Sequence, residues 1–159
     1  LGHRSFIYLT THRSWHDFHQ RGEGMRSFLE GAGRDHKVDV FEALFSEEDA
    51  YRRVMRACSE GLAASAILAS TDRHALGALA ALGDAGLHVP RQISVMGFDD
   101  YVTSGFIRPA LTTMQMPAVG MGRHAVTLLL DLLNGRTADP ERLFGASLIE
   151  RNSTGPAGQ

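Results

Sequence analysis

The sequence has little cysteine, because Cys58 stands alone among 159 residues. A single cysteine excludes an internal disulfide and a zinc site built from several thiolates. The eight histidines do not fall into a metal-ligand spacing either, so we expect no metal and no other cofactor. This cysteine usage is compatible with a reducing, cytoplasmic environment.

An excess of one charge is also lacking. The chain has 16 Lys and Arg residues against 18 Asp and Glu residues, which gives a net charge of −2 near neutral pH. Without a basic excess, the chain lacks the electrostatic footprint of a nucleic-acid-binding surface. We therefore expect this chain alone not to bind DNA measurably.

Long apolar runs are missing as well. None approaches the roughly 20 residues that cross a bilayer, and no secretory signal peptide opens the sequence. We therefore expect no membrane partner. Because the first residue is Leu and a strand-like stretch follows almost at once, we expect the sequence to be a fragment of a longer protein.

Catalytic signatures are absent too. The chain contains no G-x-S-x-G elbow, no phosphate-cradling glycine loop and no H-E-x-x-H. The glycines of "GEGM" and "GAG" lie within and after an expected helix, so they do not form a dinucleotide fingerprint. We therefore expect that the chain is not an enzyme. An enzyme of flavodoxin-like topology is kept as a third hypothesis for its function.

What the sequence does contain is a repeated alternation of apolar runs and amphipathic segments. Short apolar runs predict strands, each followed at short distance by a segment with helical spacing of apolar residues. This order predicts an α/β fold, a doubly wound parallel sheet. The expected strands cover 5–10, 38–45, 65–70 and 89–98, and the expected helices begin near residues 19, 47 and 72.

The regular alternation of expected strands and helices ends after residue 100. Residues 101–117 contain two prolines and predict a long connection without regular structure. A Leu-rich helix is expected over 119–133, a last strand over 145–150, and a polar tail after it.

Polar and aromatic side chains follow each expected strand. In an open parallel sheet, ligands bind outside the carboxyl ends of the strands. These ends therefore predict a rim suited to a small hydroxylated or heterocyclic ligand, with a cation, carboxylates and aromatic rings together. The candidate binding residues are Trp15, Asp17, Arg21, Phe45, Thr71 and Asp99.

Several of these candidates have a structural alternative. Asp72 is expected to be the N-cap of the helix that it opens, and Thr71 is a second candidate for that cap. Arg21 near a helix start does not complement the helix dipole, which favours a binding role over a simple salt bridge to a rim carboxylate. Phe45 and Trp15 are equally compatible with core or loop packing.

The stretch "GFDDY" (97–101) places two carboxylates directly after an apolar run. Burying an unpaired carboxylate costs roughly several kcal/mol or more, so at least one of the two should face water or a bound group. We expect Gly97 to allow the turn, one of Asp99 and Asp100 to hold it by bonding its own backbone, and the other to reach the ligand.

These motifs, taken together, resemble the effector-binding core of the lactose and galactose repressor family. The resemblance covers almost the whole chain and is weakest over 34–64. The matching segments are "LGHR" (1–4), "RGEGM" (21–25), "TDRHALGA" (71–78), "GLHVP" (86–90), "SVMGFDD" (94–100), "PALTTMQMP" (109–117) and "LIERNS" (148–153).

The resemblance implies a fold of two periplasmic-binding-protein-like subdomains with an effector in the cleft between them. It also implies an N-terminal helix-turn-helix that binds operator DNA as a dimer. By this resemblance the N-terminal head and most of the first subdomain are absent. Residues 1–114 form the second, C-terminal subdomain, 115–136 a crossover and helix of the first, 137–151 a return strand, and 152–159 a tail.

The resemblance also assigns roles to individual residues. Arg21 matches the arginine that bonds the effector, and Asp99 matches the first Asp of the family's pair. Phe45 matches a position that stacks on the ligand in some members, and Thr71 stands where many relatives have Asn, Ser or Gly. Trp15 and Asp17 fall in the segment that varies with effector identity.

Surface apolar residues predict self-association. Val102, Phe106 and Ile107 lie in an expected surface connection, and such a patch is typical of an interface. We expect a homodimer that uses this segment.

We interpret the chain as the sensing part of a repressor whose effector is a sugar or, alternatively, a purine. The alternative function is the periplasmic sugar-binding protein of an importer.

Overall fold

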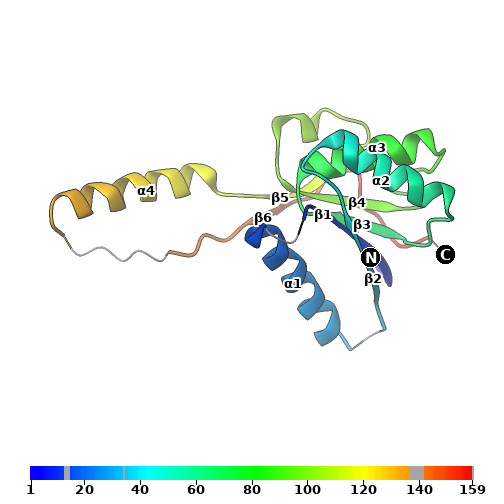
Figure 1. Ribbon diagram of the computed structural model, residues 1–159, viewed down its shortest axis with the longest axis horizontal. Helices are drawn as coiled ribbons and strands as arrows, with labels where there is room; N and C mark the ends of the chain where they lie inside the picture. Colours follow the sequence, from blue (N-terminus) through cyan, green and yellow to red (C-terminus); the bar gives the residue numbers. More distant parts are fainter. Residues whose placement is uncertain (13–14, 34, 137–141, 159) are drawn as a thin grey trace.

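The computed structural model describes residues 1–12, 15–33, 35–136 and 142–158. Strands and helices alternate along the first two thirds of the chain, as Figure 1 shows. The elements are β1 (Ser5–Thr10), α1 (His16–Gly31), β2 (Lys37–Glu42), α2 (Glu47–Ser59), β3 (Ala66–Ala69), α3 (Asp72–Asp84), β4 (Ser94–Asp99), η1 (Val102–Gly105), β5 (Thr112–Gln115), α4 (Ala118–Leu133) and β6 (Ser147–Ile149).

The six strands form one sheet in the order β2-β1-β3-β4-β5-β6. All neighbouring pairs are parallel except β5 and β6, which are antiparallel. Helix α1 lies on one face of the sheet, and α2 and α3 lie together on the other (Figure 1). The predicted α/β fold, a doubly wound and mainly parallel sheet, is therefore confirmed.

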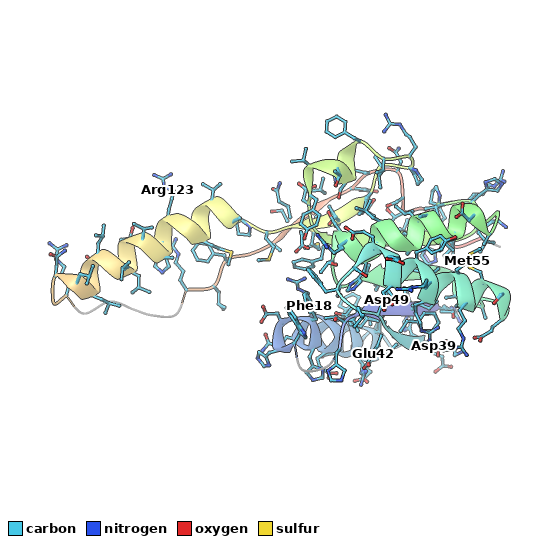
Figure 2. The ribbon with its side chains drawn as sticks, turned by 45° about the horizontal axis from the view of Figure 1, so that its top comes forward. Phe18, Asp39, Glu42, Asp49, Met55 and Arg123 are labelled. Atoms are coloured by element: carbon cyan, nitrogen blue, oxygen red, sulfur yellow. The ribbon has the colours of Figure 1, made fainter. Side chains whose placement is uncertain are left out.

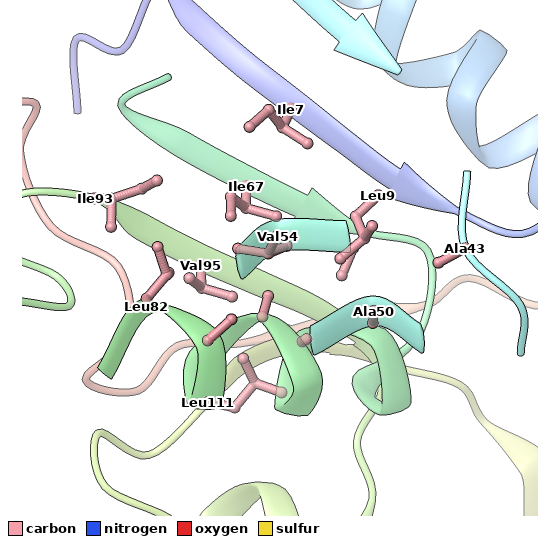
Figure 3. Close-up of a cluster of buried hydrophobic side chains, with 14 residues drawn as sticks. Ile7, Leu9, Ala43, Ala50, Val54, Ile67, Leu82, Ile93, Val95 and Leu111 are labelled. Carbon is pink, nitrogen blue, oxygen red and sulfur yellow. The ribbon is translucent and has the colours of Figure 1, made fainter. Parts of the chain in front are cut away.

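The main core lies between the sheet and the pair α2 and α3. Alternate residues of a strand point to the same face, so Ile7 and Leu9 both point into this layer (Figure 3). Gly77 lets the two helices approach closely, because a Cβ at that position would lie 2.2 Å from the backbone oxygen of Glu47. The core is therefore made of small and branched side chains packed under close helices.

The start of α2 follows the capping rule. Ser46 is the N-cap, and its hydroxyl accepts a hydrogen bond from the Asp49 N–H at 3.1 Å. The Leu44 N–H donates to the Asp49 carboxylate at 2.6 Å, which turns the chain before the helix. The strand predicted to reach Phe45 therefore ends at Glu42, and Phe45 lies in the turn instead.

The connection expected over 101–117 contains regular structure that the sequence reading missed. Residues 102–105 form the short helix η1, and Thr112–Gln115 form strand β5. The polar tail is also held in place. Ser153 is fully buried, and its hydroxyl accepts from the Thr112 N–H and donates to the Val95 carbonyl. The tail therefore ties β4 to β5.

Helix α4 projects away from the sheet (Figure 1). None of its residues is buried, and four of its five Leu side chains are more than half exposed: Leu129, Leu130, Leu132 and Leu133. Figure 2 shows Arg123 on this helix, far from Phe18 and Met55 on the main body. The helix predicted over 119–133 thus exists, but it presents its apolar side chains without a covering sheet in the described part of the chain.

Candidate functional site

The carboxyl ends of β1, β3 and β4 meet at one edge of the sheet. β1 continues into α1 on one face, whereas β3 continues into α3 on the other. This divergence creates a topological switch point, which is where open parallel sheets bind ligands. The predicted rim residues all come from segments that begin at or near this edge.

Arg21 reaches this edge from the second turn of α1. Its guanidinium donates to the Ser70 carbonyl at 2.6 Å and lies 3.9 Å from the Asp99 carboxylate. The same group stacks over the Phe98 ring at 3.8 Å from its centroid and lies 5.1 Å from that of Phe18. The aromatic residue inside "GFDDY" is therefore a platform for Arg21, a role that the sequence reading missed.

Asp99 ends β4 beside Arg21, with 21% of its side chain exposed. Burial raises the pKa of Asp99 from 3.8 to about 6, although the Arg21 charge opposes this rise and the Asp72 charge adds to it. Its backbone φ of 125° lies in a region that a non-glycine residue rarely adopts. A partly buried carboxylate in strained backbone is typical of a functional position.

Asp72 does not cap α3, contrary to expectation. Thr71 is the N-cap, and its hydroxyl accepts from the His74 N–H at 3.2 Å. Asp72 is fully buried and accepts from the Tyr101 N–H and from the hydroxyls of Ser104 and Thr113. Asp72 therefore anchors the segment after β4 to the start of α3.

Gly97 has a different role from the one predicted. A Cβ at Gly97 would lie 2.2 Å from a carboxylate oxygen of Asp72, so this glycine makes room for the anchor. The turn itself lies at Asp99 and Asp100, which both have positive φ.

Asp100 holds that turn through distant partners and not through its own backbone. Its carboxylate accepts from Arg151 at 2.6 Å and from the Gln115 amide at 2.8 Å. Because Arg151 follows β6, this contact ties the end of β4 to the returning chain. The sequence reading placed the turn correctly but missed its partners.

An aromatic stack lies beside the switch point. The Trp15 and Phe45 rings are 6.0 Å apart and inclined by 16°, and Phe18 stacks on both rings. Trp15 is 53% exposed and Phe45 is 38% exposed, whereas Phe18 is buried. Phe18 was missed, although its spacing of three residues from Trp15 places both rings on one side of the helix start.

The other two predicted site residues differ in accessibility. Thr71 is 1% exposed, and its hydroxyl is engaged by the α3 cap. Asp17 is exposed in the first turn of α1, where its charge complements the helix dipole.

A hollow of about 230 Å³ lies beside Arg21, which lines it together with mainly apolar side chains of β3 and β4.

The three predicted interface residues also differ in how exposed they are. Val102 and Phe106 are 81% and 78% exposed on η1 and just after it. Ile107 instead packs against the core, because the chain turns inward there toward the buried Leu111. Ile107 is therefore only partly exposed.

The residues that the structure describes contain neither a metal-binding cluster nor a membrane-spanning helix. No three His, Cys, Asp or Glu side chains among them are grouped closely enough to hold a metal ion. No helix in the same ranges is both long and apolar enough to span a bilayer.

A family described as the periplasmic binding protein-like domain matches residues 1–154. The chain is 36% identical over 131 residues to the transcriptional repressor MelR of Bacillus subtilis, covering 82% of this chain and 38% of that protein. It is 34% identical over 120 residues to the repressor PurR of Pasteurella multocida, covering 75% of this chain and 36% of that protein.

Solved structures show the same relationship. A dimeric Lac repressor matches with a TM-score of 0.90 and 30% identity, over 97% of this chain and 56% of that one. A LacI-family regulator from Enterococcus faecium with bound ribose matches with a TM-score of 0.86 and 27% identity, over 98% of this chain and 58% of that one. The chain thus spans well under half of the two curated relatives and just over half of these structures.

The fold defines a domain of the periplasmic-binding-protein type. The chain belongs to the lactose and galactose repressor family, whose effector-binding core it carries in part. Because the curated relatives are repressors, the importer alternative is not favoured.

Proposed function

We propose that this chain is the effector-sensing second subdomain of a cytoplasmic transcriptional repressor, without catalytic activity, and that its effector is a sugar. The observation that carries the proposal is the placement of Arg21 and Asp99 side by side at the switch point, next to the exposed stack of Trp15 and Phe45. Thr71 and Asp17 lie at the edge of this set and are not needed for it.

The chemistry of the set favours a sugar over a purine. A sugar hydroxyl donates to a carboxylate and accepts from a guanidinium, so two neighbouring hydroxyls match Asp99 and Arg21 together. The apolar face of a sugar ring packs on aromatic rings such as Trp15. A purine would also stack, but it offers fewer donors to Asp99. The ribose-bound relative supports this choice, and the PurR relative keeps the purine as the alternative.

The mechanism is a shift between two orientations of two subdomains. Helix α4 and the crossover around it belong to the first subdomain, which supplies the apolar cover that α4 lacks among the described residues. An effector that bridges the cleft binds one orientation better than the other and so shifts the population. Operator DNA is bound only by an N-terminal head outside this chain.

The regulator works as a homodimer, to which the exposed Val102 and Phe106 contribute. The dimeric form of the Lac repressor relative supports this arrangement. Ile107 supports the segment from beneath, since it packs against the core.

A thermal-shift screen of the intact regulator tests the proposed effector. The panel contains pentoses, hexoses, disaccharides and purine bases at millimolar concentration. We expect a sugar to raise the unfolding midpoint, since a ligand at 100 times its Kd stabilises by about 2.7 kcal/mol. If only a purine raises the midpoint, the effector is a purine and not a sugar. If neither class raises it, the proposal is overturned.

A further inference from the structure

His74 is a buried histidine that the binding site described above does not use. It lies in the first turn of α3, directly behind the switch point, and is fully buried. A buried histidine in the first turn of a helix does not serve the helix dipole, which favours negative charge there. Its partners therefore decide what it does.

The hydrogen bonds of His74 fix its tautomer. Nε2 lies 3.0 Å from the Leu44 carbonyl, which can only accept, so Nε2 carries the proton. Nδ1 then accepts from the hydroxyls of Ser70 at 3.1 Å and Thr71 at 3.2 Å. The neutral ring is satisfied on both sides, and it joins the turn after β2 to the end of β3.

The two joined segments carry the two halves of the proposed site. On one side, the Phe45 ring follows Leu44 and meets the His74 ring edge-on, with centroids 5.9 Å apart. On the other side, the Ser70 carbonyl accepts from Arg21. His74 therefore links the aromatic stack to the charged pair through a single buried ring.

We propose that His74 is a positioning residue that fixes the distance between the aromatic stack and the Arg21–Asp99 pair. This inference rests on the proposed function, because it concerns the geometry of that same site. Leu44 is 69% exposed, and its backbone is held by the His74 ring, by the Asp49 carboxylate and by the Ser46 N–H. Among these, only His74 ties the turn to the end of β3.

Burial lowers the pKa of His74, and the Leu44 carbonyl and the carboxylates of Glu47 and Asp49 oppose that effect, whereas Arg73 adds to it. The folded protein thus holds the neutral ring near pH 7. Both forms of the ring donate from Nε2 to the Leu44 carbonyl, so the link depends on the presence of this donor and not on the charge of the ring.

Trp15 reports on this link without any ligand. It is the only tryptophan in the chain, and it stacks on Phe45. The test compares intrinsic fluorescence and acrylamide quenching of the intact regulator with those of His74→Leu and His74→Gln at pH 7.5. Gln keeps a donor for the Leu44 carbonyl, whereas Leu removes it.

We expect His74→Leu to shift the Trp15 emission at pH 7.5 and to raise its quenching about twofold. His74→Gln should stay close to the wild type, because its amide still donates to the Leu44 carbonyl.

Effector titration provides a second readout. We expect His74→Leu to lose about tenfold in affinity for the sugar identified by the screen, and His74→Gln to recover most of it. If no ligand binds the wild type, the proposed function fails while the fluorescence comparison still tests His74. Identical Trp15 emission and quenching in all three proteins would overturn the inference.

Discussion

At the scale of single residues, the site combines groups that each lower the stability of the folded chain. Asp99 is a carboxylate in a partly buried place with positive φ, and Arg21 lies beside it on an aromatic platform. Their separation of 3.9 Å is longer than a direct hydrogen bond, so both retain capacity for a ligand. Such an arrangement lowers stability in exchange for binding.

The raised pKa of Asp99 makes a stability prediction. A carboxyl whose pKa rises on folding contributes stability below pH 3.8 and loses it as the pH rises through about 6. At pH 7 the charged form therefore costs stability, with an upper bound of about 3 kcal/mol. We expect Asp99→Asn to stabilise the protein by about 1–3 kcal/mol at pH 7.

Urea unfolding at pH 7 and at pH 4 measures this difference. We expect the advantage of Asp99→Asn to shrink at pH 4, where the wild-type carboxyl is largely protonated. Asp39→Asn is the matched control, because Asp39 is exposed and paired with Lys37 at 3.0 Å, and it should change little. A destabilised Asp99→Asn at pH 7 would show that the Arg21 pair outweighs burial.

At the scale of elements, local pattern predicted most of the sheet. The apolar runs of β1, β3 and β4 were found because buried parallel strands are continuously apolar. β5 was missed because it is short and stands between two prolines. It is held by partners far along the chain, such as Ser153, which no local pattern reveals.

The candidate site was likewise predicted only in part from the sequence. Arg21 and Asp99 could be found from strand ends and helix position alone. The roles of Phe98 and Asp72 could not, because their partners come from segments distant in sequence. Sequence therefore identified the charged groups but not the packing that holds them.

The close contact of α2 and α3 makes a prediction at this scale. A Cβ at Gly77 would overlap the Glu47 backbone, which cannot move without shifting α2. We expect Gly77→Ala to lower the free energy of unfolding by about 1–3 kcal/mol. Gly83→Ala in the same helix has open space and should instead stabilise by up to about 1 kcal/mol. Equal effects of the two substitutions in urea unfolding would contradict this packing.

At the scale of the whole molecule, exposed apolar surface points to assembly. Phe106 is 78% exposed on the segment proposed for the dimer. We expect the intact regulator to sediment as a dimer at micromolar concentration and Phe106→Glu to sediment as a monomer, because a charge there would be desolvated at the interface. Phe28→Glu is the control, since Phe28 is equally exposed on α1, and it should remain dimeric. A monomeric wild type would refute the interface.

The charge of the chain makes a second prediction at this scale. With a net charge of −2, residues 1–159 cannot release many phosphate counterions. We expect the purified chain not to shift duplex DNA at physiological salt in an electrophoretic assay. A shift that weakens as salt increases would show that this chain itself carries a DNA-binding surface.

The central claim is that Arg21 and Asp99 bind the effector, and calorimetric titration tests it most directly. The sugar identified by the screen is titrated into the intact regulator, into Arg21→Ala and into Asp99→Ala. Arg26→Ala and Asp39→Ala serve as controls, because both residues are exposed and away from the switch point. A lost charged hydrogen bond is worth about 1.5–3 kcal/mol, so we predict that affinity falls roughly ten- to hundred-fold in the two site variants and stays unchanged in the controls. Unchanged affinity in Arg21→Ala and Asp99→Ala, together with a large loss of stability, would contradict the claim and make both residues structural.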